Sequence, residues 1–123
     1  MDHPTLVAST WPALADQLQD WGLKAGADSG EPMTSGAVLH TWDNTAAGQT
    51  VQTGLWRCTP GGWVVEDRLD EESVIILAGR ARLTDADDTV TEVTEGSTFV
   101  QPKGWYGRWD VEETIVKFFV SIR

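Results

Sequence analysis

The acidic stretch GWVVEDRLDEESVIILAG, which runs from residue 62 to residue 79, holds the side chains best suited to chemistry. Glu66 and Arg68 fall in phase on one face of an extended chain, and Glu72 falls in phase with the apolar strand that follows it. A carboxylate that faces an apolar interior needs a neighbouring cation, because burial penalises its charge. Arg68 is the nearest such cation in the sequence, so the stretch can form a buried ion pair or an acid–base centre if this face points inward.

Lys117 is the second candidate cation, because it stands in the strand-like stretch IVKFFVSI among apolar or small neighbours. If its side chain points inward, its charge needs compensation, and Glu72 is the carboxylate that we pair with it. Strand alternation leaves a second interpretation open, in which Lys117 faces water on the outer surface. The wholly apolar face of the strand would then consist of Val116, Phe118, Val120 and Ile122.

Seven tryptophans are the main oddity of the composition. Core packing is the simplest role for any single tryptophan, because the indole supplies a large apolar volume. Trp105 and Trp109 differ from the others, since they share one face of an extended chain with Gly107 between them. We therefore predict that these two indoles flank a position without a side chain and contact a ligand there.

The remaining nucleophiles and metal ligands are isolated in the sequence. Cys58 has no histidine nearby, and a lone cysteine usually packs as a small hydrophobic residue. The two histidines, His3 and His40, stand far apart, and a single histidine on a strand is usually a surface or packed residue. These residues alone predict neither a cysteine nucleophile nor a metal centre.

The size and charge of the chain limit its function classes. At 123 residues it suits one compact domain with one core. A formal charge of −10, with 9 basic against 19 acidic residues, argues against binding to nucleic acid or to an anionic membrane surface. The single cysteine cannot form an internal disulfide, and the start of the chain lacks the pattern of a secretory leader. A reducing cytoplasm is the expected compartment.

An N-terminal arm over residues 1–35 is predicted to carry one short helix. Ser9 or Thr10 can cap this helix, and Pro12 suits its first turn. The apolar residues at helical spacing are Leu14, Leu18 and Trp21. Residues 25–36 contain small residues, Gly and Pro without periodicity, so they predict an extended connector.

The rest of the chain, residues 36–123, is predicted to form one all-β domain. Short runs rich in β-branched and aromatic residues alternate there with turn residues, which is typical of an antiparallel sandwich or barrel. No second helical pattern interrupts these runs, and this argues against a βαβ fold.

Two stretches, GGWVVEDRLDEESVIILAG and EGSTFVQPKGWYGRWD, resemble the two consecutive motifs of the cupin superfamily. Six residues separate Glu72 from Gly79, as in the first motif, and the second motif fits Gly96, Pro102 and Gly104. The chain is most similar to the single-domain branch that includes ureidoglycine aminohydrolase-like and ethanolamine-utilisation-like cupins. This resemblance implies a double-stranded β-helix, the RmlC-like jelly-roll barrel, and a homodimer. Exposed-looking apolar residues of the arm agree with a dimer: Trp11, Leu14, Leu18 and Trp21.

The metal-binding histidines of the resembled family are missing. Their positions in the two motifs hold Glu66, Arg68 and Gly107, and an arginine in a ligand shell would repel a metal ion. We therefore expect no catalytic metal of the usual cupin kind and no other cofactor. A hard cation held by carboxylates, with His40 arriving from a neighbouring strand, is an open alternative.

The first functional hypothesis is a metal-free site in the barrel that binds a small polar, nitrogen-containing metabolite or performs acid–base chemistry on it. Glu72 and Lys117 form its ionisable pair, and the resemblance places a set of side chains in the interior: Val64, Glu66, Arg68, Glu72, Trp105, Gly107 and Trp109. The second hypothesis is a degenerate cupin that serves as a structural or interaction module. A metal-dependent cupin enzyme, such as an aminohydrolase, comes third, and whether the chain is an enzyme at all stays open.

Overall fold

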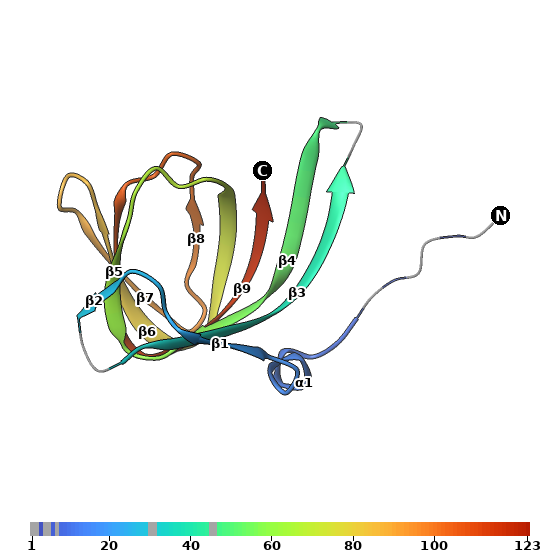
Figure 1. Cartoon of the computed structure of the whole chain (residues 1–123), viewed down its shortest axis with the longest axis horizontal. Helices are drawn as coiled ribbons and strands as arrows, with labels where there is room; N and C mark the ends of the chain where they lie inside the picture. The colour runs from blue at the N-terminus through green and yellow to red at the C-terminus, as the bar shows by residue number, and fades with distance from the viewer. Residues whose placement is uncertain (1–2, 4–5, 7, 30–31, 45–46) are drawn as a thin grey trace.

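The computed structural model describes residues 3, 6, 8–29, 32–44 and 47–123, and only the backbone within 40–44. They form one short helix and nine strands that curl into a barrel-like sheet (Figure 1). The elements are α1 (Trp11–Ala15), β1 (Gln19–Leu23), β2 (Ala27–Ser29), β3 (Thr34–Asn44), β4 (Gln49–Cys58), β5 (Gly61–Val65), β6 (Glu71–Asp85), β7 (Val90–Thr94), β8 (Thr98–Gln101) and β9 (Gly107–Ile122). The prediction of an all-β chain with a short N-terminal helix is confirmed.

The two longest strands, β6 and β9, organise the sheet, and every pairing in it is antiparallel. The strand order is β1-β3-β4-β9-β5-β2, while β7 and β8 pair with β6. β9 pairs with β4 and β5 on one side and with β6 on the other, so it joins the two halves of the curled sheet. Among the described residues, no helix is long and apolar enough to cross a membrane.

The helix of the arm is shorter than its apolar repeat predicted. Thr10 caps α1 by accepting a hydrogen bond from the Ala13 backbone N–H at 3.4 Å, but the helix ends at Ala15. Trp21 lies instead in β1, which pairs with the edge of β3. The prediction that the helix extends to Trp21 is therefore wrong, because hydrogen bonds to an available strand edge outweigh a weak helical repeat.

The stretch that we predicted to be an extended connector, residues 25–36, is also partly built into the sheet. β2 pairs with β5 at one end of the strand order, and β3 already begins at Thr34. Between them Met33 is 2% exposed and belongs to the core. The arm thus supplies two edge strands and a core side chain.

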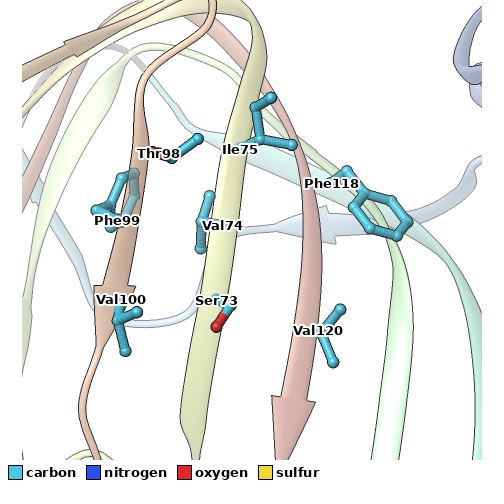
Figure 2. Close-up of a pocket in the computed structure, with 8 residues that line it drawn as sticks. All are labelled: Ser73, Val74, Ile75, Thr98, Phe99, Val100, Phe118 and Val120. Atoms are coloured by element: carbon cyan, nitrogen blue, oxygen red, sulfur yellow. The ribbon is translucent and has the colours of Figure 1, made fainter.

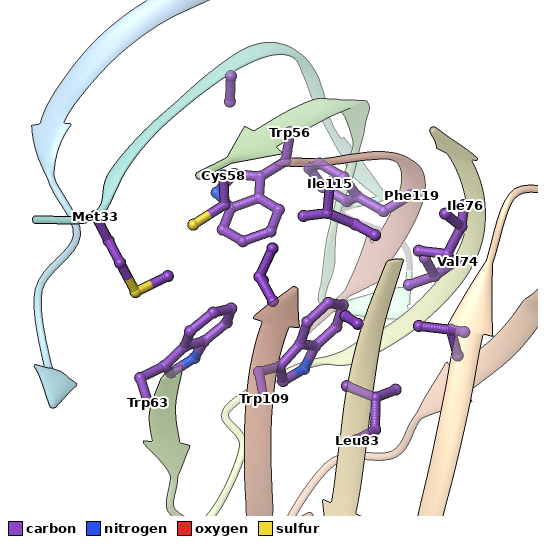
Figure 3. Close-up of a cluster of buried hydrophobic side chains, with 14 residues drawn as sticks. Met33, Trp56, Cys58, Trp63, Val74, Ile76, Leu83, Trp109, Ile115 and Phe119 are labelled. Atoms are coloured by element: carbon purple, nitrogen blue, oxygen red, sulfur yellow. The ribbon is translucent and has the colours of Figure 1, made fainter. Parts of the chain in front are cut away.

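Alternation along β9 separates an inner from an outer face. Ile115 and Phe119 belong to the buried cluster, whereas Phe118 is 37% exposed on the other side of the strand. The labelled side chains of that cluster gather inside the curl of the sheet (Figure 3). Lys117 has the same parity as Ile115 and Phe119, so the strand directs it inward.

Gly79 interrupts the long pairing of β6 with β9. Its φ of +88° lies in the left-handed region, and the register shifts on either side of it, between Ile76 and Arg80. A Cβ at this position would collide with the backbone carbonyl of Thr114. The bend of β6 over β9 therefore requires glycine for both its conformation and its close approach.

We expect Gly79→Ala to destabilise the fold more than Gly96→Ala does. Gly96 has the same φ of +88°, but a Cβ added there would meet open space, so its substitution costs the backbone strain alone, about 1–2 kcal/mol. Gly79→Ala adds a steric cost of about 1–3 kcal/mol, because the partner strand must move. Urea unfolding measures both free energies, and equal losses would show that the close approach contributes nothing.

Candidate functional site

A cavity of about 260 Å³ opens inside the curled sheet. Strands β4, β5, β6, β8 and β9 contribute to its wall, and the arm adds two residues beside them. The lining residues are Trp21, Lys24, Gln52, Trp56, Trp63, Val65, Arg68, Asp70, Glu72, Gln101, Trp109, Lys117, Phe119 and Ser121. Three of them are basic and two are acidic, so the cavity is formally positive inside a chain of charge −10.

A buried carboxylate with two cations forms the centre of this cavity. Glu72 is 5% exposed; its Oε1 accepts a hydrogen bond from Nζ of Lys117, and its Oε2 accepts one from Nη2 of Arg68. Asp70 shares the guanidinium, with Oδ1 at 3.1 Å from Nη2 of Arg68. The burial of Glu72 is thus compensated by two ion pairs.

A chain of hydrogen bonds through Gln101 fixes the orientation of the Glu72 carboxylate. The indole Nε1 of Trp109 donates to Oε1 of Gln101 at 2.8 Å, and Nε2 of Gln101 donates to Oε1 of Glu72 at 3.5 Å. An indole N–H can only donate, so the amide oxygen must face Trp109 and the amide nitrogen must face the carboxylate. Glu72 and Gln101 are also direct partners in the pairing of β6 with β8, which places the amide beside the acid.

Three of the four tryptophans that line the cavity, Trp56, Trp63 and Trp109, pack against one another (Figure 3). The rings of Trp63 and Trp109, which face each other across the β5–β9 pairing, stack with centroids 5.4 Å apart. Trp56 meets both of them edge-on, at 5.8 and 6.2 Å. The ammonium of Lys117 lies 4.8 Å from the Trp56 ring, and that of Lys24 lies 4.6 Å from the Trp63 ring. Both lysines therefore gain cation–π contacts.

Lys117 is 7% exposed and lies in the cavity, so the alternative in which it faces water is wrong. Burial lowers the pKa of its ammonium below the usual range, and the nearby Arg68 guanidinium lowers it further. The Glu72 carboxylate, and to a smaller extent Asp70, oppose that shift. An amine in this environment gives up its proton more readily than an exposed lysine.

The structure brings together Glu72, Lys117, Arg68 and Trp109, but it does not place Glu66 with them. Glu66 is exposed and Val64 is 53% exposed, because β5 turns Trp63 and Val65 inward and ends before Glu66. The prediction that Val64 and Glu66 point into the barrel is therefore wrong by one position of strand phase.

Trp105 also lies outside the cavity lining. It precedes β9, is partly buried against the core, and donates its Nε1 hydrogen to Oδ1 of Asp85 at 2.7 Å. A Cβ at Gly107 would collide with its ring. The indole thus covers the position without a side chain, while Trp109 alone of the two contributes to the cavity.

Several lining residues escaped the sequence reasoning, among them Lys24, Trp63 and Gln101. Gln101 directly precedes the motif residue Pro102, and this adjacency was the available signal. To predict that Trp63 lines the cavity, the inward-facing positions of β5 had to be assigned correctly. No signal pointed to Lys24, because it falls between the predicted helix and the predicted extended connector.

The described residues contain no group of three or more His, Cys, Asp or Glu side chains that could hold a metal ion. The side chain of His40, which we considered as a ligand from a neighbouring strand, lies outside the described part of the structure. Cys58 is fully buried, and burial raises the pKa of its thiol to about 11, so the reactive thiolate is disfavoured.

We expect Glu72→Gln to destabilise the fold more than Lys117→Met does. The first change leaves the buried Lys117 ammonium without its carboxylate, at a cost of about 3–5 kcal/mol, whereas the second leaves Glu72 paired with Arg68. The double variant should recover part of the Glu72→Gln loss, because both members of one buried pair are then neutral. Urea unfolding of the four proteins tests this, and a double variant less stable than Glu72→Gln would contradict it.

Comparisons with known proteins identify the fold. The chain resembles a protein of unknown function of the DUF861 family from Pseudomonas syringae pv. tomato, with a TM-score of 0.72 at 18% identity. The match covers 85% of this chain but only 43% of that one, so this chain spans less than half of its length. A putative ethanolamine utilization protein, EutQ, from Salmonella typhimurium matches with a TM-score of 0.59 at 14% identity, over 81% of this chain and 76% of that one.

EutQ from Clostridium difficile is similar to the same degree, with a TM-score of 0.60 at 13% identity, over 80% of this chain and 78% of that one. A search of curated protein sequences finds no match. These likenesses confirm the predicted jelly-roll fold. The family model for the EutQ-like cupin domain matches residues 45–119, more than half of the sequence, and the chain therefore belongs to the EutQ-like cupin domain family.

Proposed function

We propose that the chain binds a small carboxylate-bearing metabolite in its barrel cavity and acts on it by acid–base chemistry without the usual cupin metal. The buried Glu72–Lys117 pair, which opens on the cavity, is the observation that carries this proposal. A buried acid and base in one concave site are the usual requirement for general acid–base catalysis. The aminohydrolase-like alternative has no support from the ligand positions of the motifs.

Charge and size define the ligand class. Lys24, Arg68 and Lys117 outnumber the carboxylates of Asp70 and Glu72, so the cavity attracts an anion although the chain as a whole is acidic. Its 260 Å³ lie just below the range of about 300–1,000 Å³ for drug-sized ligands. A compact carboxylate with a flat or polar body therefore fits best, since the indoles supply apolar walls.

Titration of small carboxylates and amino acids should change the intrinsic fluorescence of the chain, because Trp56, Trp63 and Trp109 line the site. Lys24→Met should weaken binding by about tenfold or more, the loss of one charge-assisted contact. The matched control is Lys103→Met, which removes an exposed lysine outside the lining. If no ligand changes the emission, or if both variants bind equally, the cavity proposal fails.

A second proposal concerns self-association, and the outer face of the sheet supports it. Opposite the cavity, the outward residues of β6, β8 and β9 form an apolar hollow without a charged side chain (Figure 2). These outward residues are Ser73, Ile75, Thr98, Val100, Phe118 and Val120. A second copy of this chain carries the same charge of −10, so two copies approach with least repulsion where no carboxylate projects. We propose that this face forms the interface of a homodimer.

Phe118→Glu should convert the dimer to a monomer, because it places like charges opposite each other across a two-fold interface. Val64→Glu is the matched control, since Val64 is 53% exposed on β5 and lies outside the hollow. Sedimentation velocity at several concentrations measures both. A monomeric wild type, or equal dissociation of the two variants, would overturn the interface.

A further inference from the structure

The amine of Lys117 has surroundings unusual for a structural ion pair. Among the described residues its Nζ donates to one carboxylate oxygen, Oε1 of Glu72. Three aromatic faces also surround it, with the ring centroids of Trp56, Trp109 and Phe119 at 4.8, 5.3 and 5.4 Å. Among the described residues the nitrogen therefore has one carboxylate acceptor and several aromatic neighbours, and Lys117 still lines the cavity.

These surroundings are those of an activated lysine nucleophile. A lysine becomes nucleophilic when burial or a neighbouring cation favours its neutral form, and here both are present, because Arg68 lies beside the pair. The Glu72 carboxylate is in direct contact and can take the proton that the ammonium releases. Cation–π contacts with the indoles oppose this loss, while Lys117 remains part of the cavity lining.

We propose that Lys117 forms a Schiff base with a small 2-oxo acid that enters the cavity, an inference that rests on the proposed ligand site. Glu72 first accepts a proton from the ammonium. The amine lone pair then attacks the carbonyl carbon, the carbonyl π electrons move to oxygen, and that oxygen takes one proton from the attacking nitrogen to give a neutral carbinolamine. Loss of that hydroxyl as water, with Glu72 returning the proton, leaves a protonated imine. Ammonium and ketone thus become iminium and water, with no further reactant.

The choice of a 2-oxo acid follows from the charges around Lys117. A neutral aldehyde would use the amine but none of the other cations of the cavity. Arg68 offers a planar guanidinium that already binds carboxylates, and its Nε is a buried donor without a hydrogen-bond partner among the described residues. Lys24 adds a second positive group over the Trp63 ring. A carboxylate next to the carbonyl can therefore be held while the carbonyl carbon meets Nζ of Lys117.

The test is reductive trapping of the full chain with pyruvate or glyoxylate and sodium cyanoborohydride. The chain has only three lysines, Lys24, Lys103 and Lys117, so peptide mapping can assign every adduct and separate it from the N-terminal amine. We expect Lys117 to be labelled faster than Lys103 near neutral pH, by about tenfold for each unit by which its pKa lies below that of an exposed lysine. Equal rates at the two lysines would overturn the inference.

Two variants separate chemistry from folding. Lys117→Arg keeps the positive charge beside Glu72 but has no amine that can form an imine, so it should abolish the adduct while the urea midpoint stays close to that of the wild type. Lys103→Met should leave labelling at Lys117 unchanged. Persistence of the cavity adduct in folded Lys117→Arg would show that another amine is responsible.

Lactate distinguishes failure of this inference from failure of the ligand site. Lactate carries a carboxylate but no ketone or aldehyde group, so it should change tryptophan emission without forming an imine adduct. If lactate and pyruvate both change the emission and pyruvate leaves Lys117 unlabelled, the cavity binds carboxylates and the Schiff base is excluded. If neither compound changes the emission and pyruvate does not label Lys117, the ligand site and the Schiff base are both contradicted.

Discussion

The ion pairs of Glu72 are the constraint on which the interior depends. A carboxylate that is 5% exposed is tolerated only beside positive charge, and Lys117 and Arg68 supply it from a neighbouring strand and from the preceding loop. The backbone holds Arg68 in place, since its N–H donates to the Trp105 carbonyl and its carbonyl accepts from the Gly104 N–H. The electrostatics of the cavity thus depend on the contact between two loops at its rim.

Strand register converts this local pairing into a cavity. The inward parity of β9 directs Ile115, Lys117 and Phe119 to one side, and the pairing of Trp56 with Lys117 places an indole beside the ammonium. The pairing of Trp63 with Trp109 stacks the other two rings. Since side chains alternate with period two, a slip of one residue in β9 would exchange this polar, aromatic interior for the apolar outer face.

The sequence was sufficient to predict the all-β architecture and the inward position of Glu72, because strand alternation and motif spacing are local signals. It was insufficient for the phase of β5, where Glu66 was predicted inward and is exposed. That phase is set by the stacking of Trp63 on Trp109, a contact between strands that no local pattern contains. The prediction for the arm was wrong for a similar reason. Whether the residues near Trp21 form a helix or a strand depends on the free edge of β3, which lies outside the local sequence window.

Two positions where the cupin motif would carry a histidine, Arg68 and Gly107, have a physical explanation in this structure. Where the second motif would carry a histidine, Gly107 lies under the Trp105 ring, which leaves no room for a side chain. Where the first motif would carry its second histidine, Arg68 contacts Glu72 directly. Positive charge for the buried carboxylate therefore comes from side chains of the chain itself. A lysine held in that role retains a titratable nitrogen next to an acid, and the proposed Schiff-base chemistry rests on this arrangement.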